Sequence, residues 1–205
     1  MKNYDYEAAY RQAQSAYWGL APNRMCLRVI ELLPPDRPLK LLDIGCGEGR
    51  DAVFFARCGY DVTAFDLTSS GIEKLRRLAD QANVYVNAFS ADINDYRLDE
   101  NYDILYSCGA LHYIKPNLRG EIMENYKSYV NNNGIAAFQA FVTKPFIPPP
   151  PEREEAYLWK SGQLFLYFHD WYIEHCAEDV YHCNSSGIPH RHADNCVIAR
   201  KYREN

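Results

Sequence analysis

Three glycines on alternate positions behind a carboxylate form the most distinctive chemical pattern in the sequence. The pattern runs Asp43-x-Gly45-x-Gly47-x-Gly49 and lies between a short apolar run and a helical apolar pattern. Glycine permits positive φ and lets a ligand approach the backbone closely, because it has no Cβ. The N–H groups at the start of the following helix suit a carboxylate or a phosphate. This stretch is therefore predicted to be a cofactor-binding turn between a strand and a helix.

The spacing of these glycines argues against a dinucleotide cofactor. A dinucleotide fingerprint requires Gly-x-Gly-x-x-Gly, and its third glycine would fall on Arg50. A second carboxylate, Asp66, closes the next apolar run about 20 residues past the turn, which suits bidentate acceptance of two ribose hydroxyls. The alternative role for Asp66, capping the next helix, is weaker because Thr68 and Ser69 can serve there.

Length and composition indicate a globular chain with a sizeable core and without a basic surface. The 205 residues are 47% hydrophobic and 14% aromatic, and the formal net charge is −5. We expect one domain over residues 1–205, burying roughly 70% of the surface that the unfolded chain exposes. The net negative charge gives no sign of a basic surface that would bind nucleic acid or an anionic membrane. The predicted partner is a small molecule, with the chain a monomer or a homodimer.

The cysteines and the N-terminal residues indicate the compartment. Seven cysteines are scattered without a Cys-x-x-Cys pair, which argues against a disulfide framework and against a four-cysteine zinc site. The first residues contain no apolar signal region, and no run reaches 18 apolar residues. We therefore expect a soluble, cytoplasmic protein with reduced thiols.

Strand and helix patterns alternate along most of the chain. Predicted strands cover residues 39–44, 61–66, 84–88, 102–107 and 135–141, and predicted helices cover 48–57, 69–81 and 117–130. The chain then ends in two strands, 171–182 and 191–201, joined by a turn at 184–187. The predicted fold is α/β: a doubly wound, mostly parallel, Rossmann-like seven-stranded sheet that closes in an antiparallel hairpin. Ligands bind such sheets at the carboxyl ends of the strands, where Asp43, Asp66, Asp92 and Cys108 lie.

Two segments outside this alternation are candidates for covering the pocket. Helices at about 5–17 and 23–33 would form an N-terminal helical cap over residues 1–37. Its aromatic side chains Tyr17 and Trp18 would either contact substrate or cover the core. A proline-rich insertion at 144–162 would be either a lid, with Trp159 on its apolar underside, or a surface linker.

The C-terminal stretch His190-Arg191-His192 carries the most chemistry outside the glycine turn. In an extended chain both histidines face one side, and Arg191 faces the other. Three interpretations compete: catalytic or anion-orienting groups, metal ligands together with His182 and Cys183, or exposed edge residues. We favour the catalytic role and expect no metal, because the spacing of the possible ligands is irregular.

The glycine turn resembles motif I of the class I S-adenosylmethionine (SAM) methyltransferases. The later strand ends add to the resemblance, with Asp92-Ile93 after the third strand and Tyr102-Asp103-Ile104-Leu105 before Leu111-His112-Tyr113-Ile114. The resemblance implies a SAM site, and S-adenosylhomocysteine (SAH) as the product, held by Asp43, Gly45, Cys46, Gly47, Gly49, Arg50, Asp66, Leu67, Asp92, Ile93 and Cys108. Asp95 is close enough to remain an alternative to Asp92 at the adenine. His112 would lie on the acceptor side, beside Tyr17, Trp18 and Trp159.

A narrower resemblance covers roughly residues 17–202. The stretch 41–66, Gly162-Gln163-Leu164 with Trp171, and residues 189–192 and 198–201 are similar to the tellurite-resistance (TehB-like) methyltransferase family. The resemblance implies methyl transfer to a small acceptor: tellurite or selenite, a small thiol or another metabolite. Relatives often have Gly-Glu-Leu where Gln163 stands, and some have His-Arg at the positions of Tyr181 and His182, so the acceptor stays open.

The chemistry of SAM sets what the acceptor site must do. The sulfonium methyl is already activated, so the protein chiefly aligns the nucleophile, the methyl carbon and the leaving sulfur. A thiolate or an oxyanion needs no base and would be held by His190, Arg191 and His192, whereas an amine or a hydroxyl needs a general base. The alternatives are a natural-product or metabolite N/O-methyltransferase and a SAM-binding protein without turnover. An NAD-linked oxidoreductase is disfavoured by Arg50 and by the terminal hairpin.

Overall fold

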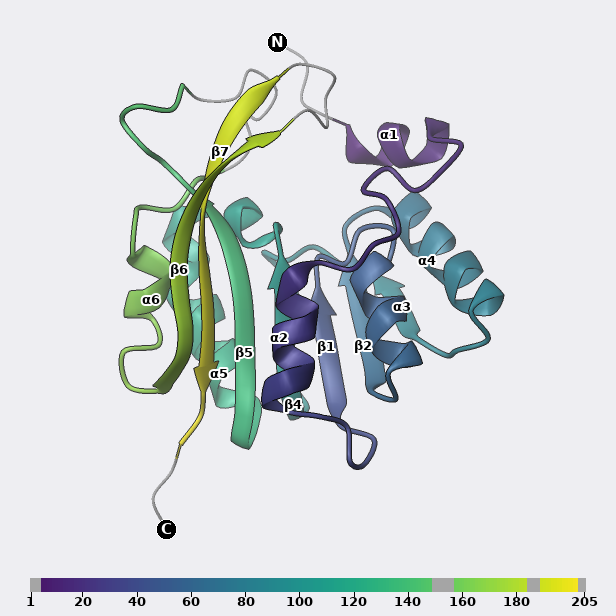
Figure 1. Cartoon of the computed structure of the whole chain (residues 1–205), viewed down its shortest axis with the longest axis horizontal. Helices are drawn as coiled ribbons and strands as arrows, with labels where there is room; N and C mark the ends of the chain where they lie inside the picture. Colours follow the sequence, from purple (N-terminus) through teal and green to yellow (C-terminus); the bar gives the residue numbers. More distant parts are fainter. Residues whose placement is uncertain (1–4, 149–156, 184–188, 203–205) are drawn as a thin grey trace.

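A twisted seven-stranded sheet organises the computed structural model, which describes residues 5–148, 157–183 and 189–202 (Figure 1). The strand order is β3-β2-β1-β4-β5-β7-β6, and β7 alone among the described strands runs in the direction opposite to the other six. The predicted mostly parallel sheet with a terminal hairpin is confirmed. The strands are β1 Lys40–Ile44, β2 Asp61–Asp66, β3 Asn87–Ser90, β4 Tyr102–Cys108, β5 Val130–Val142, β6 Tyr172–Cys183 and β7 His190–Arg200.

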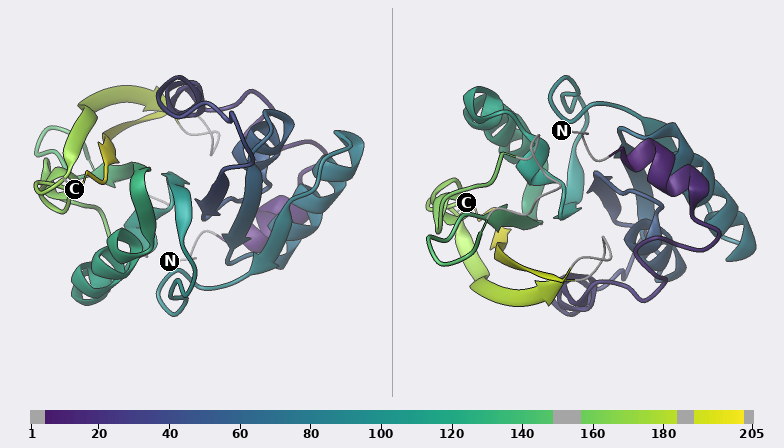
Figure 2. Two further views of the ribbon diagram at one scale, coloured as in Figure 1. Left: turned by 90° about the horizontal axis from the view of Figure 1, so that it is seen from below. Right: turned by 90° about the horizontal axis from the view of Figure 1, so that it is seen from above.

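Helices cover both faces of the sheet, as the end-on views in Figure 2 show. On one face pack α2 Arg24–Leu32, α3 Arg50–Arg57 and α4 Ser69–Gln81; on the other pack α5 Arg119–Ser128 and α6 Gln163–Leu166. The short helix α1 Tyr6–Gln12 and the 3₁₀ turns Leu111–Tyr113 and Pro116–Leu118 complete the described elements. No helix in the described ranges is both long enough and apolar enough to cross a membrane.

The central strands are buried on both faces because helices cover both. Ile104, Leu105 and Tyr106 of β4 are fully buried, which explains why this strand reads as a continuous apolar run in the sequence. Burying a side chain such as Leu105 contributes roughly 1.5–3 kcal/mol relative to leaving it in water. The rigid centre of the sheet therefore holds the carboxyl ends of β1, β2 and β4 in place.

The structure corrects the start of the third strand. The strand begins at Asn87, three residues later than expected, because the backbone of Val84 is still hydrogen-bonded to the last turn of α4. The Val84 N–H donates to the Ala79 carbonyl, and Asn83 takes a left-handed conformation with φ 53°. This is the geometry of a helix C-terminus closed by a left-handed residue.

Three further expectations have different outcomes. The first helix ends at Gln12, five residues earlier than expected, because Ala13 is extended and the chain after it bonds to the glycine turn, where the Tyr17 N–H donates to Glu48. Residues 149–156 of the proline-rich stretch and the turn at 184–187 lie outside the described residues. The lid therefore stays a prediction.

The terminal hairpin extends beyond the sheet. The pairing of β5 with β7 stops at Val142 opposite Ala193, whereas β6 and β7 stay paired as far as Cys183 opposite His190. Because β7 runs antiparallel to β5, this extra length lies past the carboxyl end of β5, at the edge where β1, β2 and β4 also end (Figure 1). The hairpin thereby brings Tyr181–Cys183 and His190–His192 over the ligand-binding edge of the sheet.

The N-terminal segment is fixed to the same edge by polar contacts. Glu7 accepts hydrogen bonds from the backbone N–H of Ser70 at 3.1 Å and from the Ser69 hydroxyl, at the helix start that Thr68 does not cap with its side chain. The Lys74 ammonium lies 2.7 Å from Glu48 and also donates to the Ala13 carbonyl. These contacts join α1 and the following loop to α4 and to the glycine turn.

One carboxyl in β7 lies in an environment that opposes its charge. Asp194 is buried, lies opposite Asp179 across the hairpin and accepts a hydrogen bond from the Gln139 amide. Burial, with a further contribution from Asp179, raises the pKa of Asp194 to about 6. The folded protein therefore holds this proton more tightly than the unfolded chain does. The stability that this tighter proton binding adds is fully present below the ordinary pKa of 3.8 and is lost as the pH rises through about 6.

Replacing Asp194 by Asn should stabilise the protein at neutral pH and have little effect at acidic pH. Asn keeps the acceptor for Gln139 but removes the buried charge. We expect the melting temperature of Asp194→Asn to exceed that of the unsubstituted protein at pH 7.5. The increase should be on the order of 2–4 °C for each kcal/mol that the substitution adds to the free energy of unfolding. The difference should vanish at about pH 3, below the ordinary pKa of 3.8, because the carboxyl is then protonated in both the folded and the unfolded state. The exposed Asp80→Asn serves as the control. Calorimetric melting at both pH values tests this, and an equal difference at the two would contradict it.

Candidate cofactor and acceptor site

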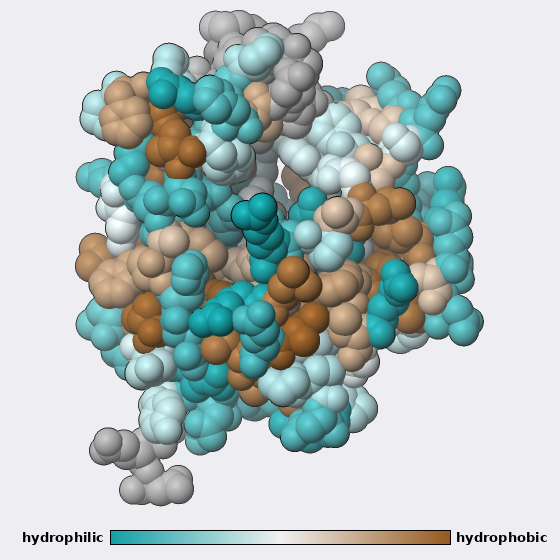
Figure 3. All heavy atoms as spheres, viewed as in Figure 1, coloured by the Kyte–Doolittle hydropathy of each residue, from teal (hydrophilic) through white to brown (hydrophobic). Residues whose placement is uncertain are grey.

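A cavity of about 1340 Å³ opens at the carboxyl edge of the sheet. Its walls come from the loops after β1, β2, β3 and β4, from the N-terminal segment and from the strand ends of the hairpin, the end of β6 and the start of β7. Figure 3 shows the surface hollowed between the hairpin and the N-terminal segment. The volume exceeds the roughly 300–1,000 Å³ typical of a pocket for one ligand. The cavity therefore has room for a cofactor and an acceptor together.

The glycine turn needs its glycines for both conformation and space. Gly45, Gly47 and Gly49 all have positive φ, at 71°, 55° and 83°. A Cβ on Gly45 would lie 2.2 Å from the Cβ of Ala110, and one on Gly47 would lie 3.0 Å from the Tyr10 hydroxyl. The turn is thus enclosed by the loop after β4 and by the N-terminal segment.

The backbone amides of the turn are used to hold the turn itself. The N–H groups of Gly45 and Cys46 donate to the Phe65 carbonyl at 2.9 and 3.0 Å, and that of Gly47 donates to Asp66 at 2.8 Å. These bonds tie the end of β1 to the end of β2. The turn therefore offers a ligand close backbone approach rather than a row of unused amide donors.

Asp43 is the strongest sign of a cationic ligand in the cavity. The carboxyl is 3% exposed, lines the cavity and accepts a backbone hydrogen bond from Ala52. Its Oδ2 atom is buried without a hydrogen-bond partner among the described residues. Burial raises the pKa of Asp43 well above its usual range. A buried polar atom in this state requires a partner, and a ligand carrying an ammonium group would supply one.

Asp66 lines the cavity at the end of β2, as expected of a ribose acceptor. Its Oδ1 accepts from both the N–H and the hydroxyl of Thr68, and its Oδ2 accepts from Gly47. A carboxylate offers about four acceptor positions, so three are already in use. Asp66 can accept one further hydrogen bond, from one ribose hydroxyl, without any change. To accept from two ribose hydroxyls, it must lose one of its hydrogen bonds to Thr68 or Gly47.

The next strand supplies the expected adenine end. Asp92, Ile93 and Leu67 all line the cavity, and Leu67 is strongly exposed there. Asp92 uses Oδ1 to accept from the backbone and the side chain of Asn94, at 2.8 and 3.0 Å. Within the described part of the chain its other oxygen carries no hydrogen bond, so it can accept from an exocyclic amino group.

Arg50 reaches the cavity with its charge already compensated. Its guanidinium binds both carboxylate oxygens of Asp51, at 2.8 and 3.1 Å. Asp51 also accepts from the Tyr106 hydroxyl and from the Asn23 backbone. Sequence reasoning missed Asp51, although an acidic residue in the first turn of a helix that starts at a ligand site is a usable signal.

Cys108 acts as a hydrogen-bond donor in the wall of the cavity. Its Sγ lies 2.9 Å from Oε1 of Gln139, whose amide group donates in turn to Asp194. Burial raises the pKa of the Cys108 thiol, so the sulfur stays protonated and is unsuited to act as a nucleophile. The chain of contacts links the cavity wall to the hairpin.

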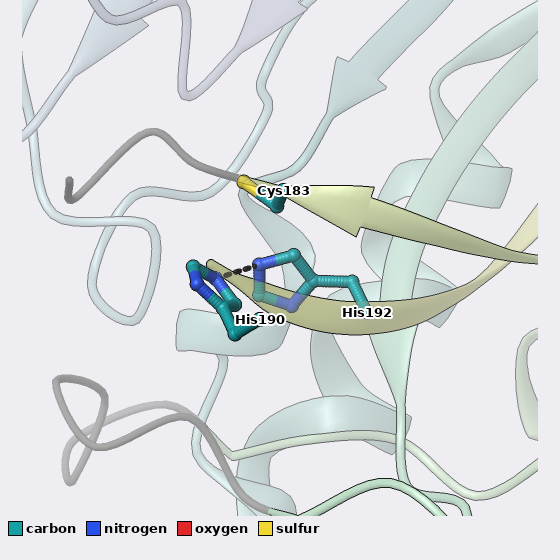
Figure 4. A group of neighbouring side chains, drawn as sticks. All are labelled: Cys183, His190 and His192. Atoms are coloured by element: carbon teal, nitrogen blue, oxygen red, sulfur yellow. Dashed lines mark hydrogen bonds between the residues drawn. The ribbon is translucent and has the colours of Figure 1, made fainter. Parts of the chain in front are cut away.

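The far end of the cavity is formed by the inner face of the hairpin. Phe141, Tyr181, Cys183 and His192 line it. The buried ring of His192 stacks on Phe141, with centroids 4.6 Å apart and planes inclined by 12°. His190 stands beside it, with the two Nε2 atoms 2.7 Å apart (Figure 4). This end combines aromatic surface with imidazole and thiol groups.

Arg191 does not join the two histidines. It is exposed and donates to the Phe146 carbonyl on the opposite side of the hairpin. Strand alternation separates it from His190 and His192, so the structure does not bring it to the cavity as a catalytic residue.

The four residues expected to contact substrate have different positions. Trp18 lines the cavity and donates its indole N–H to Tyr10 at 2.8 Å. Tyr17 packs against Tyr10 and Trp18 but does not line the cavity itself, and its backbone N–H donates to Glu48. Sequence alone does not distinguish two neighbouring aromatic residues in an irregular loop.

His112 and Trp159 belong to the core rather than to the cavity lining. The His112 ring is buried against Phe141, with centroids 4.6 Å apart. Trp159 is fully buried, donates to the Leu111 carbonyl and lies beneath the Arg119 guanidinium. Both side chains pack near the cavity, and neither lines it.

Comparison with known proteins agrees with this geometry. Residues 24–188 match the family described as "Tellurite resistance protein TehB". Over 134 residues the chain is 28% identical to a Haemophilus influenzae protein described as "Probable S-adenosyl-L-methionine-dependent methyltransferase TehB". That match covers 65% of this chain and 46% of the relative, so this chain spans about half the length of the curated relatives it matches.

Solved structures share the fold. The crystal structure of TehB from Haemophilus influenzae matches with a TM-score of 0.80 at 24% identity, covering 90% of this chain and 64% of that one. A Burkholderia thailandensis 1,6-didemethyltoxoflavin-N1-methyltransferase, solved with its acceptor and SAH bound, matches with a TM-score of 0.68 at 19% identity, over 96% and 85% of the two chains. The family match covers most of the chain, and the glycine turn, strand order and hairpin agree with it. The chain belongs to the tellurite resistance protein TehB family.

Proposed function

We propose that this protein transfers the methyl group of SAM to a small, soft nucleophile, either a chalcogen anion or a thiol. The observation that carries the proposal is the continuity of the cavity. It runs from the buried carboxyl of Asp43 and the glycine turn to the imidazole and thiol groups of the hairpin. One end suits the cationic methionine part of SAM, and the other suits a nucleophile.

The residues around the cofactor end would bind and orient rather than react. When bound, SAM supplies a methyl group already activated by its sulfonium charge. Asp43 would compensate the ammonium group, and Asp66 and Asp92 would fix the ribose and the adenine. An ammonium beside Asp43 would also remove the cost of its buried, unpartnered oxygen. The work of this half of the cavity is alignment of the methyl carbon with the acceptor.

The acceptor end favours a polarisable nucleophile over a hard oxyanion. Arg191, the expected anion-binding cation, faces away from the cavity. Phe141, Tyr181 and Cys183 give apolar and sulfur surface there, beside the imidazole of His192. A thiolate or a reduced chalcogen anion donates an electron pair to the methyl carbon while the bond from carbon to the sulfonium sulfur breaks, leaving neutral SAH. This apolar and sulfur-containing wall suits a polarisable nucleophile, because such a nucleophile needs little hydration.

Methylation of a nitrogen or oxygen atom in a larger metabolite is the second candidate. It is supported by the fold shared with the didemethyltoxoflavin N-methyltransferase and by the size of the cavity. An amine or hydroxyl acceptor needs a general base, and His192 is the imidazole that lines the cavity. A SAM-binding protein without turnover is the third candidate, and methyl transfer to any acceptor excludes it.

Asp66→Ala should weaken the binding of SAH. Losing a hydrogen bond to a charged group costs about 1.5–3 kcal/mol, which corresponds to a loss in affinity of roughly tenfold or more. Titration calorimetry with SAH measures this directly. Asp61→Asn, at the exposed start of the same strand, is the matched control and should bind as the unsubstituted protein does. Unchanged affinity in Asp66→Ala would remove Asp66 from the ribose site.

Headspace mass spectrometry should detect a volatile methylated product. The assay combines the protein and SAM with a small thiol, or with selenite or tellurite and glutathione as the reductant. His192→Phe keeps the ring stacked on Phe141 but removes the imidazole, and we expect turnover to fall at least about tenfold with SAH affinity nearly unchanged. His182→Ala, on the exposed side of β6, is the control. Absence of volatile product despite SAH binding would favour the metabolite acceptor instead.

A further inference from the structure

We propose that Cys183, His190 and His192 form a binding site for a zinc ion at the acceptor end of the cavity, and that this ion holds the acceptor as a thiolate. Each residue offers one ligand atom, and the three atoms lie within 4.8 Å of one another. The metal site stands on geometry alone, whereas the thiolate acceptor rests on the proposed methyl transfer.

The hairpin register brings the three residues together although their spacing along the chain is irregular. Cys183 lies directly opposite His190 across the strands, so their side chains project from the same face. His192 is two residues further along β7 and therefore shares that face. Figure 4 shows the thiol at the end of one strand and the two imidazoles on the other, with their nitrogen atoms meeting. His182, which the sequence pattern also suggested, points to the opposite side.

The distances require only small side-chain movements to close around an ion. Bond lengths of about 2.0 Å to nitrogen and 2.3 Å to sulfur place tetrahedral ligand atoms roughly 3.3–3.5 Å apart. The two Nε2 atoms are 2.7 Å apart, so they would separate slightly while the thiol approaches. Without an ion, two imidazole nitrogens at this distance share one proton. A metal ion replaces that proton and binds the same two lone pairs.

The donor set selects the kind of metal. One thiolate and two imidazole nitrogens suit Zn²⁺, whereas Ca²⁺ and Mg²⁺ prefer oxygen ligands. Three protein ligands are typical of zinc sites that keep a fourth position for water or substrate. Stacking on Phe141 would fix the orientation of the His192 ring, as outer groups do for metal-bound histidines.

The open position would face the reacting methyl group. Cys183 and His192 both line the cavity that contains the glycine turn, so an ion between them borders the same space. Binding to Zn²⁺ would release the thiol proton to solvent at neutral pH. The bound sulfur would then form a bond to the methyl carbon while the carbon–sulfonium bond breaks, giving a thioether and SAH with no change in the oxidation state of zinc.

Cobalt titration of the chelator-treated full chain tests the site independently of turnover. We expect one Co²⁺ per chain, the visible absorption of a four-coordinate ion, and a near-ultraviolet charge-transfer band from the Cys183 sulfur. Cys183→Ala should abolish the charge-transfer band, and His190→Ala should weaken Co²⁺ affinity at least about tenfold. Both side chains are partly exposed, so neither substitution creates a core cavity. His192→Phe tests the third ligand with its ring packing retained.

Two residues of the same strand provide matched controls. Cys176→Ser and His182→Ala remove one thiol and one imidazole from exposed positions of β6, and both should leave the cobalt spectrum unchanged. Absence of a cobalt–thiolate band, or its survival in Cys183→Ala, would overturn the metal site. Addition of 2-mercaptoethanol should roughly double the band, because two thiolates would then bind the ion; an unchanged band would overturn the thiolate acceptor.

SAH calorimetry on the same samples separates this proposal from the proposed function. Binding of SAH without the cobalt band rejects the metal site and leaves methyl transfer intact. A cobalt band without SAH binding supports the metal site and rejects the methyltransferase function, together with the role of the metal in it.

Discussion

The close approach of Gly45 to Ala110 is the contact on which the cavity depends. It sets the loop after β4 against the turn after β1 with no room for a single additional methyl group. The same turn is bound to β2 through the Phe65 carbonyl and through Asp66. Three strand ends are thus locked at one point, and the ligand-binding groups on each of them keep a fixed separation. The rigidity comes from backbone contacts and from the short side chains of Asp66 and Ala110, so it does not rely on long, flexible side chains.

The antiparallel strand builds the end of the cavity that we propose for the acceptor. A purely parallel sheet would place only strand ends and loops around the cofactor, because each strand would stop at the same edge. Here β7 enters from beyond that edge, and its first residues pair with the end of β6 past the last residue of β5. Side chains with the regular spacing of a strand are thereby held above a pocket that is otherwise built from loops. Regular backbone positions them more firmly than a loop would.

Much of the cofactor half could be predicted from the sequence because its signals are local. The positive φ of Gly45, Gly47 and Gly49 follows from their spacing behind an apolar run, and Asp66 follows from the end of the next run. Alternation along an extended strand also predicts that Arg191 faces away from His190 and His192. The contact of Arg191 with the Phe146 carbonyl agrees with that alternation.

The acceptor half depends on contacts between distant segments, which one sequence does not reveal. The pairing of Cys183 with His190 depends on the register of the hairpin, and irregular spacing along the chain concealed it. Trp159 is close in sequence to a proline run and was expected in a lid, yet it pairs with Val142 and fills the core, because a large apolar ring gains most from full burial. Likewise the role of Asp51 follows only once Tyr106 and Asn23 are seen beside it.

The fastening of the N-terminal segment sets how long a bound molecule stays. Tyr10 lies over Gly47, so a ligand seated on the turn is enclosed by a segment whose contacts to the body of the protein include Glu7 with Ser70 and Lys74 with Glu48. Exchange of spent cofactor for fresh cofactor then requires these polar contacts to open. Charge attractions near the surface weaken with added salt, over a range of about 8 Å at physiological ionic strength. The residence time of the cofactor in this protein is therefore expected to shorten as ionic strength rises, even though the carboxyl of Asp43 stays buried.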